Sequence, residues 1–224
     1  LENVDTVLHL AALNEIDSGN QPDRALEING QGTYKILKAC VTKGVSQFIY
    51  MSTFHVYGAA SGVNITELVP TKPIHPYSIT HRLAEDFVNW YRYSQGMETL
   101  ILRLSNGYGY PADEKVQRWS LVFNDLCQQA VQSGEIRLRT SGVQHRDFIS
   151  LYDVARAIEH FLTLSPSHWG DGLFNLGGET SMSIYEVAQR ISIEYKKLYG
   201  KEIPIFLGED TVTPDSKPVI YNID

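Results

Sequence analysis

Cysteine and basic residues are scarce in this sequence of 224 residues. The two cysteines, Cys40 and Cys127, stand far apart within apolar helical patterns, so they fit no metal-ligand spacing and indicate reduced core residues of a cytoplasmic protein. No run of about 18 apolar residues occurs, which argues against a membrane-spanning helix. Only 19 Lys and Arg stand against 26 Asp and Glu, giving a net charge of −7. We therefore expect no nucleic-acid partner and no membrane partner.

A glycine-rich phosphate loop is also missing, because neither GxxGxxG nor GxGxxG occurs anywhere in the sequence. The chain begins with Leu1 rather than methionine, and no signal-peptide pattern follows. These two features predict that the sequence is part of a longer protein. Hydrophobic residues make up 43% of the chain and charged residues 20%, a composition typical of globular proteins that excludes extensive disorder.

Strand-like and helix-like segments alternate along the chain, which is typical of a layered α/β protein with a largely parallel sheet. Strands are expected at residues 4–10, 47–51, 99–104, 136–139, 173–176 and 203–207. Helices are expected at residues 24–43, 77–95, 118–132, 152–164 and 184–199. The strands that end at Leu10, Met51 and Leu104 each lead into a polar loop. In an open parallel sheet such carboxyl ends form the ligand crevice.

Tyr77 and His81 are the strongest chemical feature, because they stand four residues apart on an expected helix and share one face. A tyrosine hydroxyl ionises near pH 10, so it acts as a base only beside a cation or hydrogen bonds that stabilise its oxyanion. Thr53 follows the expected strand 47–51, where its hydroxyl can donate to a substrate oxygen while Tyr77 moves the proton. Small residues in the segment 9–12 (HLAA) let a flat ligand approach the backbone.

In this order, these pieces resemble the extended short-chain dehydrogenase/reductase family, the NAD-dependent epimerases and dehydratases of nucleotide sugars. Beside the Tyr77 segment PYSITHRLAE, six segments in register carry the resemblance. They are HLAA at residues 9–12, NGQGT at 29–33, STFHVYG at 52–58, LRLSNGYG at 102–109, GVQHRDF with DVA at 142–155, and FNLGG at 174–178. A single segment of this kind is weak evidence for the family, whereas six in register make the assignment specific.

The resemblance implies a Rossmann-like parallel sheet with helices on both faces and a small α/β substrate-binding subdomain. A partial NAD-binding core is expected from residues 1–106 and 146–168, and the subdomain from residues 107–145 and 169–224. The first βαβ half of the fold, which carries the phosphate loop, is expected to lie upstream of this chain. The implied cofactor is NAD or NADP, the implied partner is a nucleotide-diphospho-sugar substrate, and a homodimer is left open.

The resemblance also assigns roles to individual residues. The catalytic residues would be Thr53, Tyr77 and His81. The nicotinamide half of the cofactor would contact Leu10, Ala11, Ala12, Asn29, Tyr77, His81 and Leu104. The substrate would contact Thr53, Asn106 and Arg146, the last two at its diphosphate, for which a guanidinium fork is suited.

Two departures from the family pattern affect the expected chemistry. His81 replaces a lysine that would keep a permanent positive charge beside the tyrosine, and a histidine is mostly neutral at pH 7. It can still hydrogen-bond a ribose hydroxyl. At the positions of Phe54 and His55, the sugar 4,6-dehydratases of the family that this sequence resembles carry an Asp-Glu pair. That pair supplies the acid and the base for removing water. This absence of carboxylates favours epimerisation or simple redox chemistry.

The leading hypothesis is C4 epimerisation of a nucleotide sugar through a keto intermediate, with Tyr77 and Thr53 acting as a pair. A reductase or dehydrogenase of the same family is the first alternative. A non-catalytic pseudoenzyme or scaffold that lost the lysine is the second. Simpler roles also stay open: His81 packs, His55 lines the pocket, and Arg146 pairs with a neighbouring aspartate.

Overall fold

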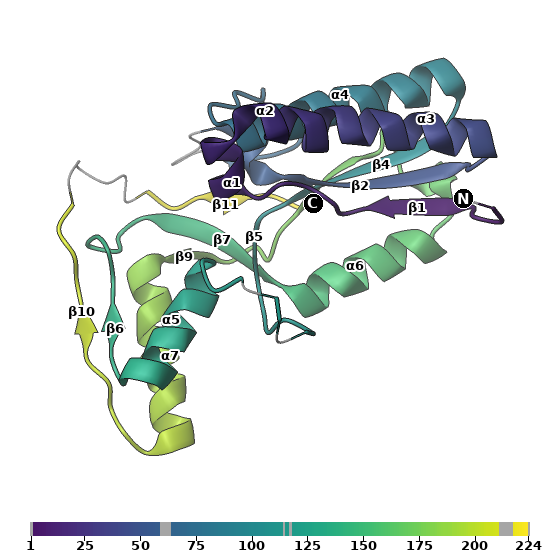
Figure 1. Cartoon of the computed structure of the whole chain (residues 1–224). Coiled ribbons are helices and arrows are strands. Elements are labelled where there is room, and N and C mark those ends of the chain that lie inside the picture. Colours follow the sequence, from purple (N-terminus) through teal and green to yellow (C-terminus); the bar gives the residue numbers. More distant parts are fainter. Residues whose placement is uncertain (1, 59–63, 114, 117, 211–216, 224) are drawn as a thin grey trace.

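The main sheet has four parallel strands in the order β1-β2-β4-β8. The structure, a computed structural model, describes residues 2–58, 64–113, 115–116, 118–210 and 217–223 (Figure 1). The strands are β1 (Thr6–His9), β2 (Gln47–Thr53), β4 (Glu98–Leu104) and β8 (Leu173–Leu176). Thr53 pairs with Leu104, and Leu104 with Leu176, so three strands end at the same edge.

Helices cover both faces of this sheet, as expected from the sequence (Figure 1). α3 (Thr33–Lys43) and α4 (Pro76–Gln95) lie on one face, and α6 (Leu151–Thr163) lies on the other. Successive strand residues point to opposite faces, so Phe48 and Ile101 pack against α3 and α4, whereas Ile49 and Leu100 pack with α6. All four are fully buried, which explains why β2 and β4 read as nearly continuous apolar runs.

The helix expected at residues 24–43 is divided into three parts. α2 (Pro22–Ala25) leads into a π-helical segment, η1 (Leu26–Gly32), and then into α3, which ends at Gly44 with φ +72°. A Cβ at Gly30 would lie 2.8 Å from the Leu83 side chain, so this glycine permits close packing of η1 on α4. The polar stretch after β1 forms a further helix, α1 (Glu15–Asn20), because the Asn14 side chain caps it.

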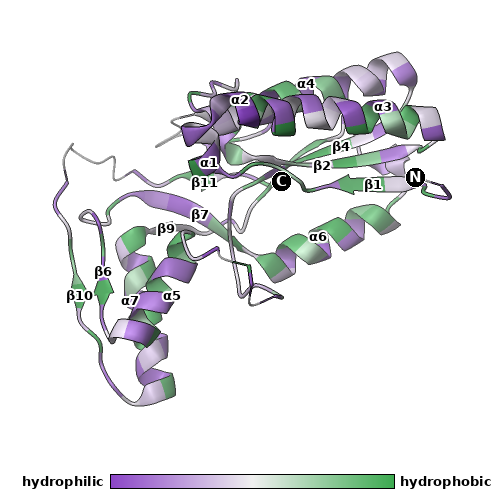
Figure 2. Cartoon of the chain, viewed as in Figure 1, coloured by the Kyte–Doolittle hydropathy of each residue, from purple (hydrophilic) through white to green (hydrophobic). Residues whose placement is uncertain are grey.

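A smaller lobe contains α5 (Val122–Ser133) and α7 (Ile184–Tyr199), packed beside a three-stranded sheet. Its strands are β5 (Asn106–Tyr108), β7 (His145–Ser150) and β9 (Ser181–Ser183); a separate pair joins β6 (Ile136–Arg137) to β10 (Ile205–Phe206). The apolar faces of α5 and α7 are turned inward (Figure 2). α5 begins four residues later than expected, because Leu121 still has extended backbone angles.

Two segments lie elsewhere than the sequence suggested. β8, which was expected in the substrate-binding subdomain, is the fourth strand of the main sheet, because its apolar residues pack on the α6 face. The residues of β7 were expected to begin the second part of the core, without a strand. They form a strand that pairs with β5 and β9 in the smaller lobe. Phe148 and Ile149 on β7 belong to different hydrophobic clusters, so this strand joins the two lobes.

The last described strand, β11 (Ile220–Tyr221), returns to the main lobe and pairs with β3 (Asn64–Ile65). Two short 3-10 helices, η2 (Phe54–Tyr57) and η3 (Pro166–His168), follow β2 and α6. Of the helices in the described ranges, none combines the length and apolar character needed to cross a membrane.

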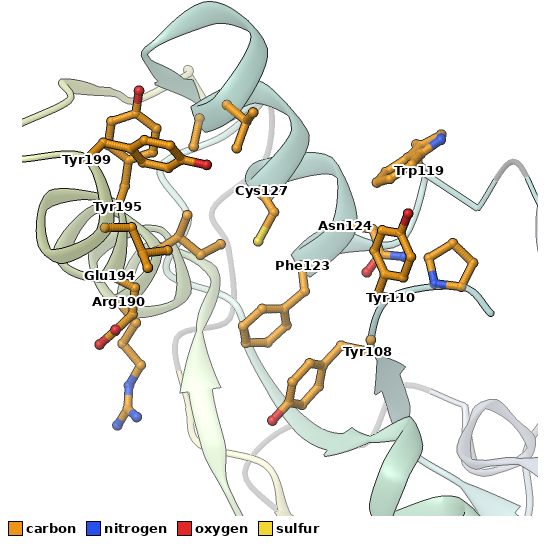
Figure 3. Close-up of a pocket in the computed structure, with 16 residues that line it drawn as sticks. Tyr108, Tyr110, Trp119, Phe123, Asn124, Cys127, Arg190, Glu194, Tyr195 and Tyr199 are labelled. Atoms are coloured by element: carbon orange, nitrogen blue, oxygen red, sulfur yellow. The ribbon is translucent and has the colours of Figure 1, made fainter. Parts of the chain in front are cut away.

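An apolar groove lies between α5 and α7 in the smaller lobe (Figure 3). Its volume is about 440 Å³, and its lining includes Tyr108, Trp119, Phe123, Tyr195 and Tyr199. Cys127 also lines it and is exposed, which corrects the expectation that both cysteines are core residues; Cys40 is fully buried. The groove contains none of the residues to which the sequence assigns catalysis.

Candidate active site

Thr53 and Tyr77 meet at the carboxyl edge of the main sheet. Thr53 is the last residue of β2, and Tyr77 lies in the first turn of α4. The start of α4 is fixed by Pro76 and by a capping box, in which the His75 side chain accepts from the Tyr77 N–H at 3.2 Å. Because of this cap, the Tyr77 hydroxyl is held near Thr53, whose side chain favours the ionised form of the tyrosine.

Burial raises the pKa of Tyr77 above its ordinary value of 10. The hydrogen bond with Thr53 and the charge of Arg118 lower that pKa in part, whereas the carboxylate of Glu15 raises it. The net shift is upward, so Tyr77 keeps its proton at neutral pH. This arrangement differs from a site in which an adjacent ammonium stabilises the phenolate.

His81 lies one helical turn below Tyr77 and is only 2% exposed. The two rings are in edge contact, with 4.5 Å between their centroids. Burial lowers the pKa of His81 to about 4, so its ring is neutral at pH 7. The positive charge that a lysine would provide is therefore absent, as the sequence predicted.

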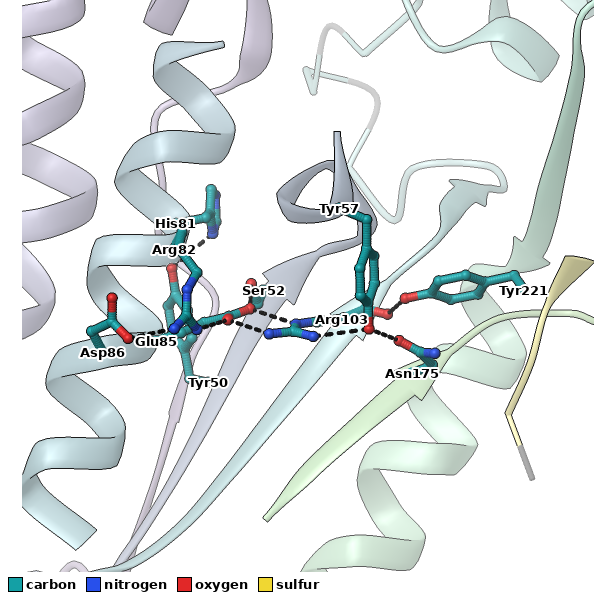
Figure 4. A network of polar contacts seen from close by, with 10 residues as sticks. All are labelled: Tyr50, Ser52, Tyr57, His81, Arg82, Glu85, Asp86, Arg103, Asn175 and Tyr221. Atoms are coloured by element: carbon teal, nitrogen blue, oxygen red, sulfur yellow. Dashed lines mark hydrogen bonds and ion pairs between the residues drawn. The ribbon is translucent and has the colours of Figure 1, made fainter. Parts of the chain in front are cut away.

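The two nitrogens of His81 differ in their partners. Nδ1 lies 2.7 Å from the Tyr50 hydroxyl (Figure 4). Burial raises the pKa of Tyr50 well above 10, so Tyr50 keeps its proton and can donate it to Nδ1. The proton of the neutral ring then sits on Nε2, which is buried and has no hydrogen-bond partner among the described residues. A buried donor without a partner is rare, and a ribose hydroxyl of a bound cofactor would satisfy it. The residues present therefore fit NAD or NADP.

Asn29 supports the neighbouring loop rather than facing open space. It is 1% exposed, its Oδ1 accepts from the Leu13 N–H at 2.6 Å, and its Nδ2 donates to the Thr80 hydroxyl at 3.0 Å. These bonds tie η1, the loop after β1 and α4 together. The loop residues Leu10, Ala11 and Ala12 are exposed beyond the end of β1. Their contacts with the cofactor, and that of Leu104, stay predictions.

Asn106 and Arg146 come together at the start of the smaller lobe. The Nη1 group of Arg146 donates to Asn106 Oδ1 at 3.4 Å. Asn106 Nδ2 in turn donates to the backbone carbonyl oxygen of Asp147 at 2.8 Å. Asp147 accepts from two backbone N–H groups, and Asp153 pairs with Arg156, so neither aspartate pairs with Arg146 in the described part of the chain. The simpler role considered for Arg146, an ion pair on a solvated turn, is not found.

Arg146 borders a cavity of about 380 Å³ with a mixed polar and apolar lining. The side chains around it that can donate hydrogen bonds are Ser120, Arg137, Arg139, Thr140, Gln144 and Arg146. Arg137 is engaged elsewhere, because its Nε pairs with Glu135 at 2.6 Å and its guanidinium lies over the Phe206 ring, and the Asp125 carboxylate also borders the cavity. Arg139 and Arg146 stay the candidates for an anionic ligand such as a diphosphate. Sequence reasoning identified only Arg146, because Arg137 and Arg139 stand in a short strand-like run with no distinctive spacing.

A buried polar network links α4 to β2 and β4 (Figure 4). The Glu85 carboxylate on α4 accepts from Ser52 at 2.6 Å and from two nitrogens of Arg103, Nε at 3.0 Å and Nη2 at 2.7 Å. Burial favours the neutral acid, but the bonds and charge of Arg103 outweigh it and lower the pKa of Glu85. The pair therefore holds α4 against β2 and β4, the elements that carry Tyr77 and Thr53.

The network continues from Arg103 toward the end of the chain. Arg103 donates to the Tyr57 hydroxyl at 2.9 Å, Tyr57 donates to Asn175 at 2.7 Å, and Tyr221 donates to the Arg103 carbonyl at 2.6 Å. Tyr57, Glu85, Arg103 and Asn175 all belong to the sequence motifs, yet the sequence gave them no role. Their positions within the motifs were the available signal.

Comparison with known proteins identifies the family. The fold and the site define a nucleotide-cofactor-binding α/β protein, and the profile of the NAD dependent epimerase/dehydratase family matches residues 1–177. The chain therefore belongs to the NAD-dependent epimerase/dehydratase family, whose cofactor is NAD or NADP, which confirms the family and cofactor expected from the sequence.

Relatives in this family include both epimerases and dehydratases. The chain is 30% identical over 193 residues to an uncharacterized UDP-glucose epimerase, YtcB, of Bacillus subtilis, covering 85% of this chain and 58% of that protein. It is 34% identical over 199 residues to the dTDP-D-glucose 4,6-dehydratase of Mus musculus, covering 85% of this chain and 52% of that protein. The chain thus spans a little over half the length of these two relatives.

Solved structures agree on the fold. The UDP-glucuronic acid 4-epimerase from Bacillus cereus, in complex with UDP-glucuronic acid and NAD, has a TM-score of 0.78 and 27% identity, over 99% of this chain and 67% of that chain. The UDP-N-acetylglucosamine 4-epimerase from Methanobrevibacter ruminantium M1 shares the fold with a TM-score of 0.83 and 24% identity, over 100% of this chain and 69% of that chain.

Proposed function

We propose that the protein carrying this chain is a cytoplasmic, NAD(P)-dependent epimerase that acts at C4 of a nucleotide-diphospho-sugar through a keto intermediate. The observation that carries the proposal is the Tyr77–Thr53 hydroxyl pair, placed beside a buried His81 nitrogen that lacks a partner. The arginine-lined cavity next to Asn106 supports a diphosphate-bearing substrate. Family membership supports the reaction type, since epimerases are among its members.

Each group in the site has a definite task in this reaction. The cofactor, when bound, supplies hydride exchange at the sugar carbon. His81 would donate from Nε2 to its ribose, and Leu10, Ala11 and Ala12 would border its nicotinamide half. Tyr77 takes the proton of the sugar C4 hydroxyl as the carbonyl forms and returns it when the opposite face has been reduced. Thr53 keeps the Tyr77 hydroxyl in place beside the C4 oxygen.

Epimerisation is favoured over dehydration by the turn that follows β2. Phe54 packs on the His55 ring with 4.1 Å between centroids and contacts Tyr221 edge-on, so this turn offers an apolar ring and an imidazole. Neither residue supplies a carboxylic acid to protonate a leaving hydroxyl. A nucleotide-sugar reductase or dehydrogenase, which needs the same hydroxyl pair, is the closest alternative.

A non-catalytic scaffold is the second candidate, because one observation favours it. The pKa of Tyr77 is raised and that of His81 is lowered, so neither side chain is in its charged form at neutral pH. Turnover separates the candidates: a panel of UDP- and dTDP-sugars is incubated with the intact protein, with and without NAD. Binding of a sugar nucleotide without any turnover would support the scaffold.

Tyr77→Phe tests the catalytic assignment. Removing the proton carrier is expected to lower kcat by about 10²–10⁴-fold while the affinity for NAD stays unchanged, since the phenyl ring keeps the contact with His81. Steady-state kinetics and cofactor titration measure the two effects. Tyr93→Phe is the matched control, because Tyr93 lies on the same helix and is 82% exposed. Full activity of Tyr77→Phe would refute the proposed function.

A further inference from the structure

His55 lies next to the reacting hydroxyls, although the proposed reaction assigns it no task. Its Nδ1 is 2.9 Å from the Thr53 hydroxyl, and its ring meets the Tyr77 ring edge-on with 5.9 Å between centroids. The 3-10 helix η2, which begins directly after Thr53, carries His55 to this position. Tyr77, Thr53 and His55 therefore form a continuous row of polar groups.

The protons of this row can be placed by counting donors and acceptors. A threonine hydroxyl has one proton and two lone pairs. The Thr53 oxygen accepts from the His55 backbone N–H at 3.3 Å and lies near the Tyr77 hydroxyl, which is protonated at neutral pH and can donate to it. Its own proton is then left for His55 Nδ1. This arrangement requires the neutral His55 tautomer with its proton on Nε2 and a free lone pair on Nδ1.

Several charged groups from neighbouring elements surround His55. Glu15 on α1, Arg146 on β7 and His75 before α4 all influence its charge, and Tyr77 on α4 faces its ring. Burial is the largest effect and lowers the pKa of His55, with Arg146 and His75 acting in the same direction and Glu15 opposing them. His55 is thus an unprotonated acceptor at neutral pH, near enough to Glu15 for its imidazolium to be stabilised transiently.

We propose that His55 receives, through the Thr53 hydroxyl, the proton that leaves Tyr77 when the substrate alcohol is oxidised. The proposal rests on the proposed function and adds the group that makes Tyr77 a base where no adjacent cation does so. His55 acts through Thr53 and does not itself touch the sugar.

The proton transfers balance as follows. Tyr77 passes its proton to the Thr53 oxygen, and Thr53 passes its original proton to His55 Nδ1. The Tyr77 oxygen then takes the proton of the substrate hydroxyl, while a bound NAD⁺ would accept the hydride of the same carbon. The substrate would become a ketone, the cofactor would be reduced, and His55 would hold the proton as an imidazolium. Reduction of the ketone reverses every transfer, so the epimerisation cycle has no net proton change.

The first test measures the tautomer of His55 in the resting protein, without any reaction. Histidine labelled with ¹⁵N in the intact protein should show His55 as the Nε2–H tautomer near pH 7. In Thr53→Val, which keeps the shape of the side chain and removes the hydroxyl, this tautomer preference should be lost. A protonated Nδ1 on His55 in the unmodified protein would overturn the proposal.

The second test uses the pH dependence of turnover. In His55→Asn the amide oxygen can still accept from Thr53 but takes no proton, so kcat near pH 7 should fall by about 10²-fold. The acid limb that His55 gives to the wild-type profile should disappear, and the remaining rate should rise about tenfold per pH unit toward alkaline pH. His160→Asn is the control, because His160 is an exposed histidine on α6 that lies outside the row; its profile should keep the acid limb.

The outcomes separate the two proposals. If Tyr77→Phe loses activity while His55→Asn keeps both its rate and its acid limb, the relay is wrong and the proposed function stands. If Tyr77→Phe keeps full activity, the proposed function is wrong as well. A fall in rate for His55→Asn with an unchanged pH profile would indicate a structural role and would also refute the relay.

Discussion

His81 is neutral because the fold buries it, and the free energy of unfolding therefore decreases when the pH falls. The pKa of His81 is lowered to about 4, whereas an unfolded chain has the ordinary value of 6.5. Between these two values the unfolded state binds the proton and the folded state does not. The stabilising effect of the neutral ring is therefore complete above pH 6.5 and is lost as the pH falls toward 4.

This linkage gives a prediction for His81→Gln, which keeps a polar side chain but does not titrate. Between pH 7 and pH 5 the wild type should lose about 2 kcal/mol of unfolding free energy more than the variant. Urea unfolding of both proteins at the two pH values measures the difference, and the shared titration of other groups cancels. Equal losses in the two proteins would mean that His81 titrates normally in the folded state.

At the scale of elements, the Glu85–Arg103 pair holds α4 on the sheet. Its side chains are 0% and 3% exposed, and the Glu85 Oε2 to Arg103 Nη2 distance is 2.7 Å. Glu85→Gln would leave the Arg103 guanidinium buried without a counter-charge, and breaking a buried pair in this way costs about 3–5 kcal/mol. The loss is expected in urea unfolding, together with a lower kcat, because α4 carries Tyr77.

The control for this change is Glu194→Gln on α7. Glu194 forms an ion pair as well, with Lys197 on the same helix at 2.6 Å. Both of these side chains are more than 60% exposed. An exposed pair of this kind contributes about 0.5 kcal/mol or less. A comparable loss in both variants would contradict a special role for the buried pair.

The elements differ in how well the sequence predicts them. α7 has the expected bounds and α4 begins only one residue early, at Pro76, because capping residues precede both helices and Gly96 and Gly200 adopt positive φ after them. β7 was missed, because HRDFIS mixes charged and apolar residues without a clean alternation. β8 was recognised as a strand but misplaced, since its partner β4 lies far away in the sequence.

In the site as well, short motifs identify single residues, whereas contacts between residues far apart in the sequence are not predicted. Short motifs led to Thr53, Tyr77 and His81, which the structure places at the end of β2 and in the first half of α4, and their roles stay predictions. The Tyr57–Asn175 and Tyr221–Arg103 bonds each join residues 118 positions apart. No spacing rule covers such contacts, so the polar network could be seen only in the folded chain.

At the scale of the whole molecule, the residues expected to contact the cofactor would border only its nicotinamide half. The pyrophosphate of NAD is usually held by a glycine-rich loop at a helix N-terminus, and the sequence has no such loop. We therefore expect a polypeptide of residues 1–224 by itself to bind NAD with a Kd weaker than about 1 mM. Isothermal calorimetry tests this expectation, and a micromolar Kd would contradict it.

The first part of the smaller lobe and α6 lie between β4 and β8 in the chain, and this sets the order in which the main sheet can be completed during synthesis. β4 leaves the ribosome with Ile101 and Leu102 ready for burial, but its outer neighbour follows about 70 residues later, a delay of roughly 4–14 s at ordinary rates of translation. During that interval β4 is an open edge of a growing parallel sheet. The nascent chain is therefore most exposed to misassociation before β8 arrives, and chaperone capacity at that moment should govern how much folded protein a cell obtains.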